Sequence, residues 1–176
     1  MGIIRPVEQV KLFTAILFGN EGVLNTAREK LSSALGLIDM SSPVWSWSHS
    51  NYYKKEMGAD LKRIFLFFER PITPDRLADI KNITNEIEDS FCRNTVNLPE
   101  RPINIDPGYM TLAKVVLAST KDYSHRIYIG KGIYAEVTLF YQDKTFQPLL
   151  HTYPDYRSGE YVDLFNKARG NLAGSR

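Results

Sequence analysis

The segment Val10–Phe18 constrains the fold most, because it reads VKLFTAILF and is largely apolar. A short apolar run that ends at Gly19-Asn20 is typical of a strand buried on both faces. A strand of this kind needs other elements packed on each side of it. Hydrophobic residues make up 43% of the 176-residue chain, which is enough for a sizeable core. These observations predict one domain spanning residues 1–176.

Helical and extended patterns alternate after this strand. Apolar residues recur at helical spacing from about Gly22 to Leu35, and Gly36 is a suitable helix stop. The stretch 37–49 reads as extended or irregular, with a break at Pro43, and the segment 61–69 reads as a strand. Thr73-Pro74-Asp75 then predicts a second helix, with a hydroxyl N-cap, a proline at the first position and an acid near the positive end of the helix dipole.

The first half therefore reads as strand, helix, strand, strand and helix. A further strand near Pro102–Asp106 would complete a ferredoxin-like βαββαβ unit. We expect an α+β fold in which this unit is extended by a C-terminal antiparallel β-hairpin region and a short terminal helix. That helix is predicted from about Ser158 to Ala168, followed by a frayed end over 170–176. Whether the second half extends the first sheet or forms its own stays open.

The hairpin is predicted over 126–130 and 133–141, around Gly130-Lys131-Gly132. A three-residue loop containing glycine keeps the apolar side chains of both strands on one face. In this register Tyr128 faces Tyr134 and Arg126 faces Glu136. Ile129 faces Ile133. The predicted apolar face comprises Ile127, Ile129, Ile133, Ala135, Val137 and Leu139.

Cysteine content and charge narrow the functional classes. Cys92 is the single cysteine, so a disulfide within the chain is excluded, and a reducing cytoplasm is the expected location. No targeting signal is visible, and the longest apolar runs are too short to span a bilayer, so no membrane association is expected. The net charge of +2, without any run of five like charges, is mild for a nucleic-acid-binding protein.

Several catalytic and ligand-binding signatures are missing from the sequence. Gly130-Lys131-Gly132 lacks the spacing and the hydroxyl residue of a P-loop, and there is no G-x-S-x-G sequence. The three histidines, His49, His125 and His151, do not have the spacing of metal ligands. The sequence therefore predicts no metal site, and it identifies no cofactor.

Four polar segments are candidates for a functional site. One of them, Asn51–Gly58, contains Glu56, which is either a base or a surface glutamate. Asp106-Pro107-Gly108 is either a tight strand connection or a rigid turn that presents an acid. Lys121, His125 and Arg126 are able to hold an anion and move a proton, or they form a solvated connection in which Glu136 neutralises Arg126. The segment 151–157 either caps a pocket or packs on the hairpin tyrosines; its candidate side chains are Tyr153, Asp155, Tyr156 and Arg157.

Several ordered motifs resemble a prokaryotic family numbered forty-four sixteen among the domains of unknown function. The motifs extend over nearly the whole chain; they are Ile4-Arg5-Pro6-Val7, Val10-Lys11-Leu12-Phe13, Asn51–Gly58, Ile105–Tyr109, His125–Tyr128, Gly132–Leu139 and Tyr153–Arg157. The resemblance implies a stand-alone bacterial or archaeal cytoplasmic protein. It implies no established activity and assigns no catalytic residue.

The leading hypothesis is a site that binds or transforms a small anionic ligand, either phosphorylated or nucleotide-like. In this hypothesis His125 handles a proton, and Asp106 or Glu136 orients it or acts as a base. Arg126 or Arg157 clamps the anion, and tyrosines stack on a ring. The full predicted set has catalytic residues His125, Asp106 and Glu136 and ligand-binding residues Lys121, Arg126, Tyr153, Asp155, Tyr156 and Arg157.

Two other hypotheses belong to different functional classes. Tyr128 and Tyr134 on the predicted hairpin could stack RNA bases, although the mild charge makes RNA a weaker expectation. Alternatively, exposed Trp45, Trp47, Tyr52 and Tyr53 would form a homodimer or partner surface.

Overall fold

The computed structural model describes residues 2–48, 54–92 and 99–174, and their strands form one antiparallel sheet. The strand order is β2-β4-β1-β5-β6-β8-β7, with β3 also paired to β4 and β9 to β8. The second half of the chain therefore extends the sheet of the first. The nine strands of this part of the chain are β1 (Lys11–Phe18), β2 (Ile38–Ser41), β3 (Trp45–Ser46), β4 (Lys62–Phe68), β5 (Ile103–Met110), β6 (Lys114–Ser119), β7 (Ile127–Gly130), β8 (Ile133–Gln142) and β9 (Thr145–Pro148).

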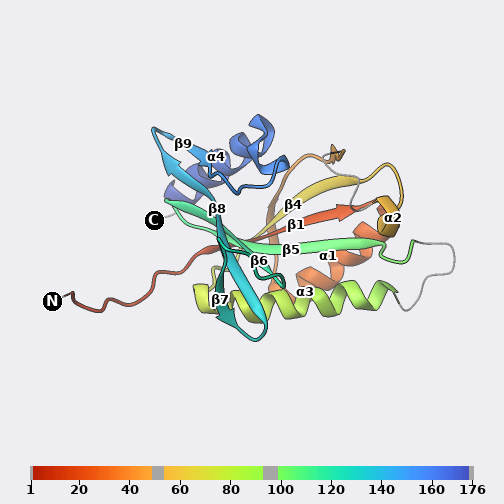
Figure 1. Cartoon of the computed structure of the whole chain (residues 1–176), viewed down its shortest axis with the longest axis horizontal. Helices are drawn as coiled ribbons and strands as arrows, with labels where there is room; N and C mark the ends of the chain where they lie inside the picture. The colour runs from red at the N-terminus through yellow and green to blue at the C-terminus, as the bar shows by residue number, and fades with distance from the viewer. Residues whose placement is uncertain (1, 49–53, 93–98, 175–176) are drawn as a thin grey trace.

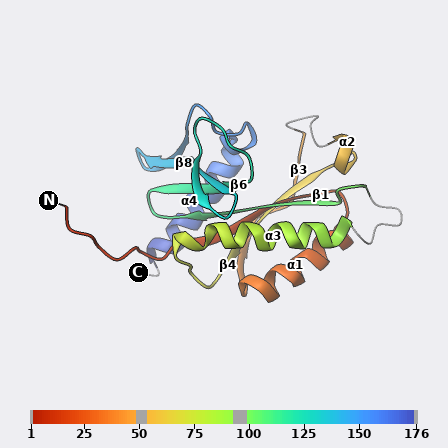
Figure 2. The same ribbon diagram turned by 60° about the horizontal axis from the view of Figure 1, so that its bottom comes forward.

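Helices cover both faces of the sheet (Figures 1 and 2). α1 (Glu21–Leu35) and α3 (Leu77–Cys92) pack on one face, and α4 (Gly159–Gly174) packs on the other. A short helix, α2 (Lys54–Met57), and two 3₁₀ turns, η1 (Pro74–Arg76) and η2 (Asp155–Arg157), lie in the connections. Within the described residues, none of the helices has the length and apolar character needed to cross a membrane.

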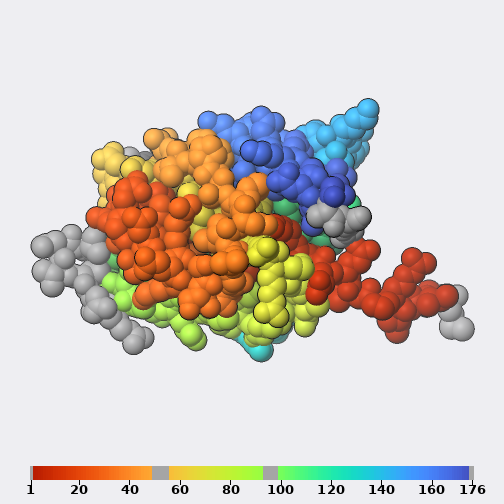
Figure 3. All heavy atoms as spheres, turned by 180° about the vertical axis from the view of Figure 1, so that it is seen from behind, coloured from red at the N-terminus to blue at the C-terminus, as the bar shows by residue number. Residues whose placement is uncertain are grey.

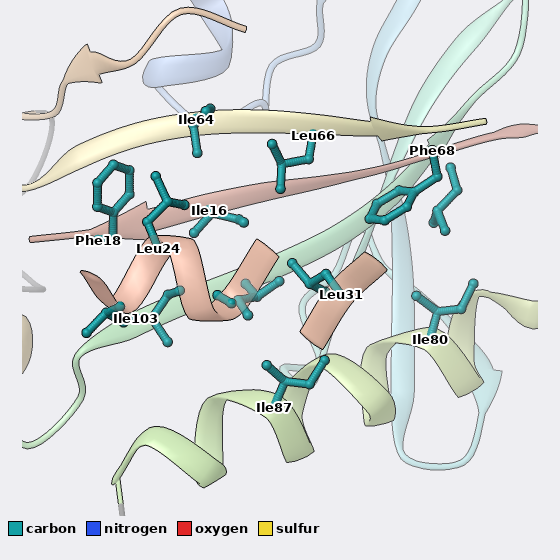
Figure 4. Close-up of a cluster of buried hydrophobic side chains, with 14 residues drawn as sticks. Ile16, Phe18, Leu24, Leu31, Ile64, Leu66, Phe68, Ile80, Ile87 and Ile103 are labelled. Atoms are coloured by element: carbon teal, nitrogen blue, oxygen red, sulfur yellow. The ribbon is translucent and has the colours of Figure 1, made fainter. Parts of the chain in front are cut away.

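β1 is buried on both faces, as the sequence predicts. Its Leu12 and Ile16 side chains join the core beneath α1 and α3, which Figure 4 shows in close-up. Its Phe13 and Ala15 side chains join the core beneath α4. The alternation of side chains along a strand gives each helical layer its own half of the core. Residues 2–9 before β1 are exposed, and they project from the body of the molecule (Figures 1 and 3).

The helices confirm the predicted positions with two differences. Thr73 holds the N-cap position, but its side chain makes no capping hydrogen bond, and a 3₁₀ turn precedes α3. α4 continues to Gly174, so the prediction that the chain frays from Gly170 is wrong. The Arg169 guanidinium supports this last part of the helix, because its Nε donates to the Leu112 carbonyl at 2.7 Å and it lies 3.6 Å from the Tyr141 ring centroid.

The prediction that Asp106-Pro107-Gly108 forms a turn is wrong, because all three residues lie inside β5. The backbone N–H and C=O of Ile105 point away from β1, toward side chains of α3. Backbone groups two residues apart in a strand point to the same side. Pro107 therefore directs its missing N–H toward a side where β5 has no paired strand, since pairing with β6 begins only at Gly108.

The hairpin register is correct at its centre and wrong toward its loop. Tyr128 pairs with Tyr134, with ring centroids 5.3 Å apart, but Ile133 lies opposite Gly130 instead of Ile129. The register shifts between Tyr128 and Gly130. A bulge of this kind adds one residue to a strand and changes which side chains oppose each other.

The predicted continuous apolar face of the hairpin is also wrong. Ile127 and Val137 are 73% and 36% exposed, whereas Glu136 is only 3% exposed. β7 lies at the edge of the sheet, and a second register shift separates Val115 from Val116 where β6 pairs with β8. The two irregularities break the strict alternation that the prediction assumed.

The predicted surface patch of tryptophans is wrong as well. Trp47 is 9% exposed, and its Nε1 donates to Asp155 at 3.0 Å. Trp45 is half-buried, with its ring 5.2 Å from that of Tyr161. Tyr52 and Tyr53 lie outside the described residues. Trp45 and Trp47 therefore contribute to the protein's own packing.

Candidate functional site

The sheet opens between β5 and β6. The two strands pair only from Gly108 to Met110, so residues 103–107 of β5 have no paired strand on that side. A cavity of about 600 Å³ lies at this opening, a volume typical of small-molecule sites. Its wall is formed by the ends of β5 and β6, and the segment 153–156 contributes to its lining.

Side chains of α3 take the place of a strand along the opened edge of β5. Lys81 Nζ donates to the Ile105 carbonyl at 3.0 Å, and the Ile105 N–H donates to Glu88 Oε1 at 2.7 Å. Lys81 and Glu88 are seven residues apart, so they lie on the same face of the helix. Both residues are buried, at 5% and 7% exposed. Their hydrogen bonds satisfy the N–H and C=O of Ile105, which would otherwise be unpaired.

The structure brings six of the nine predicted residues to the cavity: Asp106, Lys121, Glu136, Tyr153, Asp155 and Tyr156. Sequence reasoning missed several others, above all Arg63 and Lys81. The cationic side chains of the lining are Arg63, Lys81, Arg101 and Lys121, and its carboxylates are Asp106, Glu136 and Asp155. The cavity therefore combines charges of both signs.

A network of charged and polar side chains follows the β5 wall. Lys81 Nζ lies 3.1 Å from Asp106 Oδ1, and Asn104 Nδ2 donates to Asp106 Oδ2 at 2.6 Å. Arg101 donates to Glu88 at 2.9 Å and also to Asn104. Burial is the largest influence on the Glu88 carboxyl and raises its pKa.

The pKa of Asp106 is lowered. Burial alone would raise it, but the charges of Lys81 and Arg63, together with hydrogen bonds to the carboxylate, outweigh burial. The folded protein therefore binds this proton less readily than the unfolded chain does. Asp106 contributes stability above its ordinary pKa of 3.8, and this contribution is lost as the pH falls through the lower, folded-state value.

We therefore expect Asp106→Asn to destabilise the protein most near neutral pH. The difference in unfolding free energy between wild type and variant should shrink as the pH falls below about 4, because protonated Asp106 loses its charge in both states. Urea titrations from pH 7 to pH 3 measure this difference. A difference that stays constant over the whole range would contradict the inferred pKa.

The guanidinium of Arg126 donates hydrogen bonds to other groups of the protein. Its Nε donates to Glu136 at 2.7 Å, and its remaining bonds go to the Ser119 hydroxyl, the Lys121 carbonyl and the Tyr153 hydroxyl. These bonds use four of the five guanidinium N–H groups. Arg126 therefore supports the cavity wall from behind and has little capacity left to clamp an anion.

His125 and Arg157 do not line the cavity. His125 Nε2 lies 3.1 Å from Glu136 Oε2, and its ring stacks on His151 with centroids 4.3 Å apart. Arg157 donates to the carbonyls of Thr152 and Leu150, so it holds the preceding loop. The structure thus places His125 outside the cavity, behind the Glu136 carboxylate that lines it.

Arg63 and Tyr156 carry incompletely satisfied polar atoms beside the cavity. Arg63 is 5% exposed and lies 3.4 Å from Asp155, but its Nε has no hydrogen-bond partner among the described residues. The Tyr156 hydroxyl also lacks one there, and burial raises the pKa of this phenol well above its usual value. Tyr156 therefore stays a neutral donor at physiological pH.

The missed residues had recognisable signals in the sequence. Arg63 is a charge directly before the apolar segment Ile64–Phe68. Lys81 and Glu88 continue the spacing of Leu77 and Thr84 along the buried side of the second predicted helix. A charged residue on an apolar face needs a buried partner, which is a signal for a polar site.

The model of a known protein family matches almost the whole chain. The family model described as Domain of unknown function (DUF4416) matches residues 8–171. The chain belongs to this family. The DUF4416 match includes every residue that lines the cavity, from Trp47 to Tyr156. No curated protein matches the chain. In the described residues, no group of three or more histidine, cysteine or acidic side chains could hold a metal ion.

Proposed function

We propose that the cavity between β5 and β6 binds a small molecule that carries a phosphate or carboxylate group. The observation that carries this proposal is Arg63, a buried guanidinium beside the cavity whose Nε has no partner among the described residues. An unsatisfied buried donor is costly, and such atoms often mark the place of a missing ligand or water. An oxyanion has the acceptor atoms that Arg63 Nε lacks.

The other charges of the cavity favour the same class of ligand. Asp155 accepts hydrogen bonds from Trp47 and Arg63, and Asp106 is paired with Lys81 and Asn104. These acids already have donors within the protein, so they do not call for a cationic ligand. Two of the unsatisfied buried atoms belong to the cavity lining, Arg63 Nε and the Tyr156 hydroxyl, and both can donate a hydrogen bond. A ligand that supplies acceptors therefore complements the site.

We expect Arg63→Met to weaken the binding of inorganic phosphate or acetate by about 10- to 100-fold, the effect of losing a hydrogen bond to a charged group. Calorimetric titration of the purified protein measures this change. Arg76→Met is the control, because Arg76 is 57% exposed and lies outside the cavity lining.

Arg63→Met also leaves buried Asp155 without its cation and could disturb folding. Arg63→Lys serves as the second variant, since it keeps the charge but loses the planar fork. Wild-type protein that binds neither anion, or a folded Arg63→Met variant that binds as well as wild type, would refute the proposed site.

RNA binding is a weaker proposal for the same chain. Tyr128 is 58% exposed and its ring contacts that of Tyr134, so this pair offers a stacking surface. The pair lies outside the cavity lining, and its hairpin carries a single cation in the segment 127–134. Such a surface lacks the basic groove that holds a phosphate backbone.

We propose further that the first half of the chain is a ferredoxin-like unit. The support for this is that β2, β4, β1 and β5 are neighbours in that order, with α1 and α3 together on one face. The unit would differ from an isolated one because the sheet continues from β5 into β6. In this proposal the second half adds the opposite wall of the cavity.

A further inference from the structure

We infer that the ligand joins its anionic group to a planar ring, and that this ring stacks on a rim formed by Tyr123 and Tyr153. The inference rests on the proposed anion site and adds the class of molecule that the site takes. Nucleotides, aryl phosphates and aromatic carboxylates have this combination of groups. The remainder of the cavity lining would then contact the part of the ligand between ring and anion.

Tyr123 and Tyr153 line the cavity and are also accessible to solvent. These two residues are 54% and 42% exposed, whereas Arg63 and Tyr156 are 5% and 3% exposed. The aromatic surface therefore lies at the mouth, and the unsatisfied donors lie deeper. The rings of Tyr153 and Tyr156, 6.4 Å apart, connect the two levels. A ligand with an oxyanion at one end and a ring at the other matches this gradient.

A buried arginine fixes both tyrosines of the rim. The Arg126 guanidinium carbon lies 4.6 Å from the Tyr123 ring centroid, and its NH2 group donates to the Tyr153 hydroxyl. Arg126 is itself held by Glu136, and both side chains are 2% exposed or less. The rim tyrosines are thus tied to a buried ion pair.

This arrangement distinguishes the rim from an ordinary exposed tyrosine. Ordering a free aromatic side chain on binding costs conformational entropy, and a rim ordered in advance avoids that cost. Stacking of a base on an aromatic side chain is sequence-tolerant because every base has a π-face. The rim therefore fits a planar ring without needing specific hydrogen bonds. Arg126 acts as a positioning residue for that rim.

The test compares ligands that share an anion and differ in the ring. Calorimetry with inorganic phosphate, ribose 5-phosphate and adenosine 5′-monophosphate forms one series, and acetate with benzoate forms the other. We expect adenosine 5′-monophosphate to bind about 5- to 100-fold tighter than ribose 5-phosphate, and benzoate to exceed acetate similarly, because only the first of each pair has a planar aromatic ring to stack. Tyr123→Leu and Tyr153→Leu should reduce this ratio, because they weaken the binding of the nucleotide more than that of ribose 5-phosphate.

Tyr128→Leu is the matched control, because Tyr128 is similarly exposed, at 58%, but lies outside the cavity lining. It should keep the full preference for the ring. The inference is overturned if ribose 5-phosphate binds as tightly as the nucleotide, or if Tyr128→Leu removes the preference as fully as the rim variants do. Absence of binding by every anion instead overturns the underlying anion site, so the two failures are distinguishable.

Discussion

Arg126→Met should lower the free energy of unfolding by about 3–5 kcal/mol, because it leaves a buried carboxylate without its cation. Glu136 is the partner that loses the ion pair, and its side chain is 1% exposed. The substitution also removes hydrogen bonds to Ser119 and Tyr153. Urea unfolding at pH 7, followed by circular dichroism, measures the loss.

A second substitution separates the charge effect from lost packing. Glu136→Gln removes the unpaired charge, so the double variant Arg126→Met/Glu136→Gln should be more stable than Arg126→Met alone. Lys131→Met is the exposed control. Its ion pair with Asp79 lies at the surface, with the lysine 65% exposed, so solvent screens it and the variant should lose far less stability than Arg126→Met. Equal losses in Arg126→Met and Lys131→Met would show that burial does not govern the Arg126 pair.

Gly108→Ala should destabilise the protein by about 3 kcal/mol or more, because there is no space for a methyl group where β5 approaches β6. A Cβ atom at this position would lie 2.4 Å from the Val116 carbonyl oxygen and 2.5 Å from Phe13 Cζ. The oxygen belongs to the backbone of the neighbouring strand, so it cannot move away without disturbing the strand pairing. Thermal and urea unfolding of the variant measure the effect.

Gly170→Ala provides the control for this substitution. Gly170 lies in α4, and a methyl group added there would meet no atom of the described residues within 4 Å, apart from its own helix backbone and chain neighbours. Alanine favours helix over glycine by about 1 kcal/mol. We therefore expect Gly170→Ala to be neutral or stabilising. A loss below about 1 kcal/mol in Gly108→Ala would mean that the two strands separate easily at this contact.

The sequence predicted the regular elements best where local patterns determine them. The apolar run of β1, the helical spacing of α1 and the stripe of α4 each reflect side chains that face one core. It failed where non-local contacts decide the outcome. Pro107-Gly108 favours a turn locally, but β1 pairs with β5 through this position and keeps the chain extended. The two register shifts, where β8 pairs with β6 and with β7, likewise depend on strands that no local pattern identifies.

The candidate site was also predictable only where its contacts are local in the sequence. Arg126 and Glu136 were paired correctly, because a hairpin register brings them together over a short stretch of chain. Arg63 and Asp155 are 92 residues apart, and their contact depends on how η2 lies against the sheet. Polar residues from distant strands reach one cavity only through the complete topology. Sequence spacing alone does not supply that information.

The replacement of a strand by Lys81 and Glu88 also bears on how the protein avoids self-association. An open strand edge is a template on which another extended chain can pair, and aggregation commonly begins at such edges. The cavity requires β5 to be separated from β6, which would expose this kind of edge in the middle of the sheet. The two side chains occupy the N–H and C=O of Ile105 at the position where an intruding strand would bind. The helix thus leaves the sheet open at the cavity while its side chains block pairing by other polypeptides at Ile105.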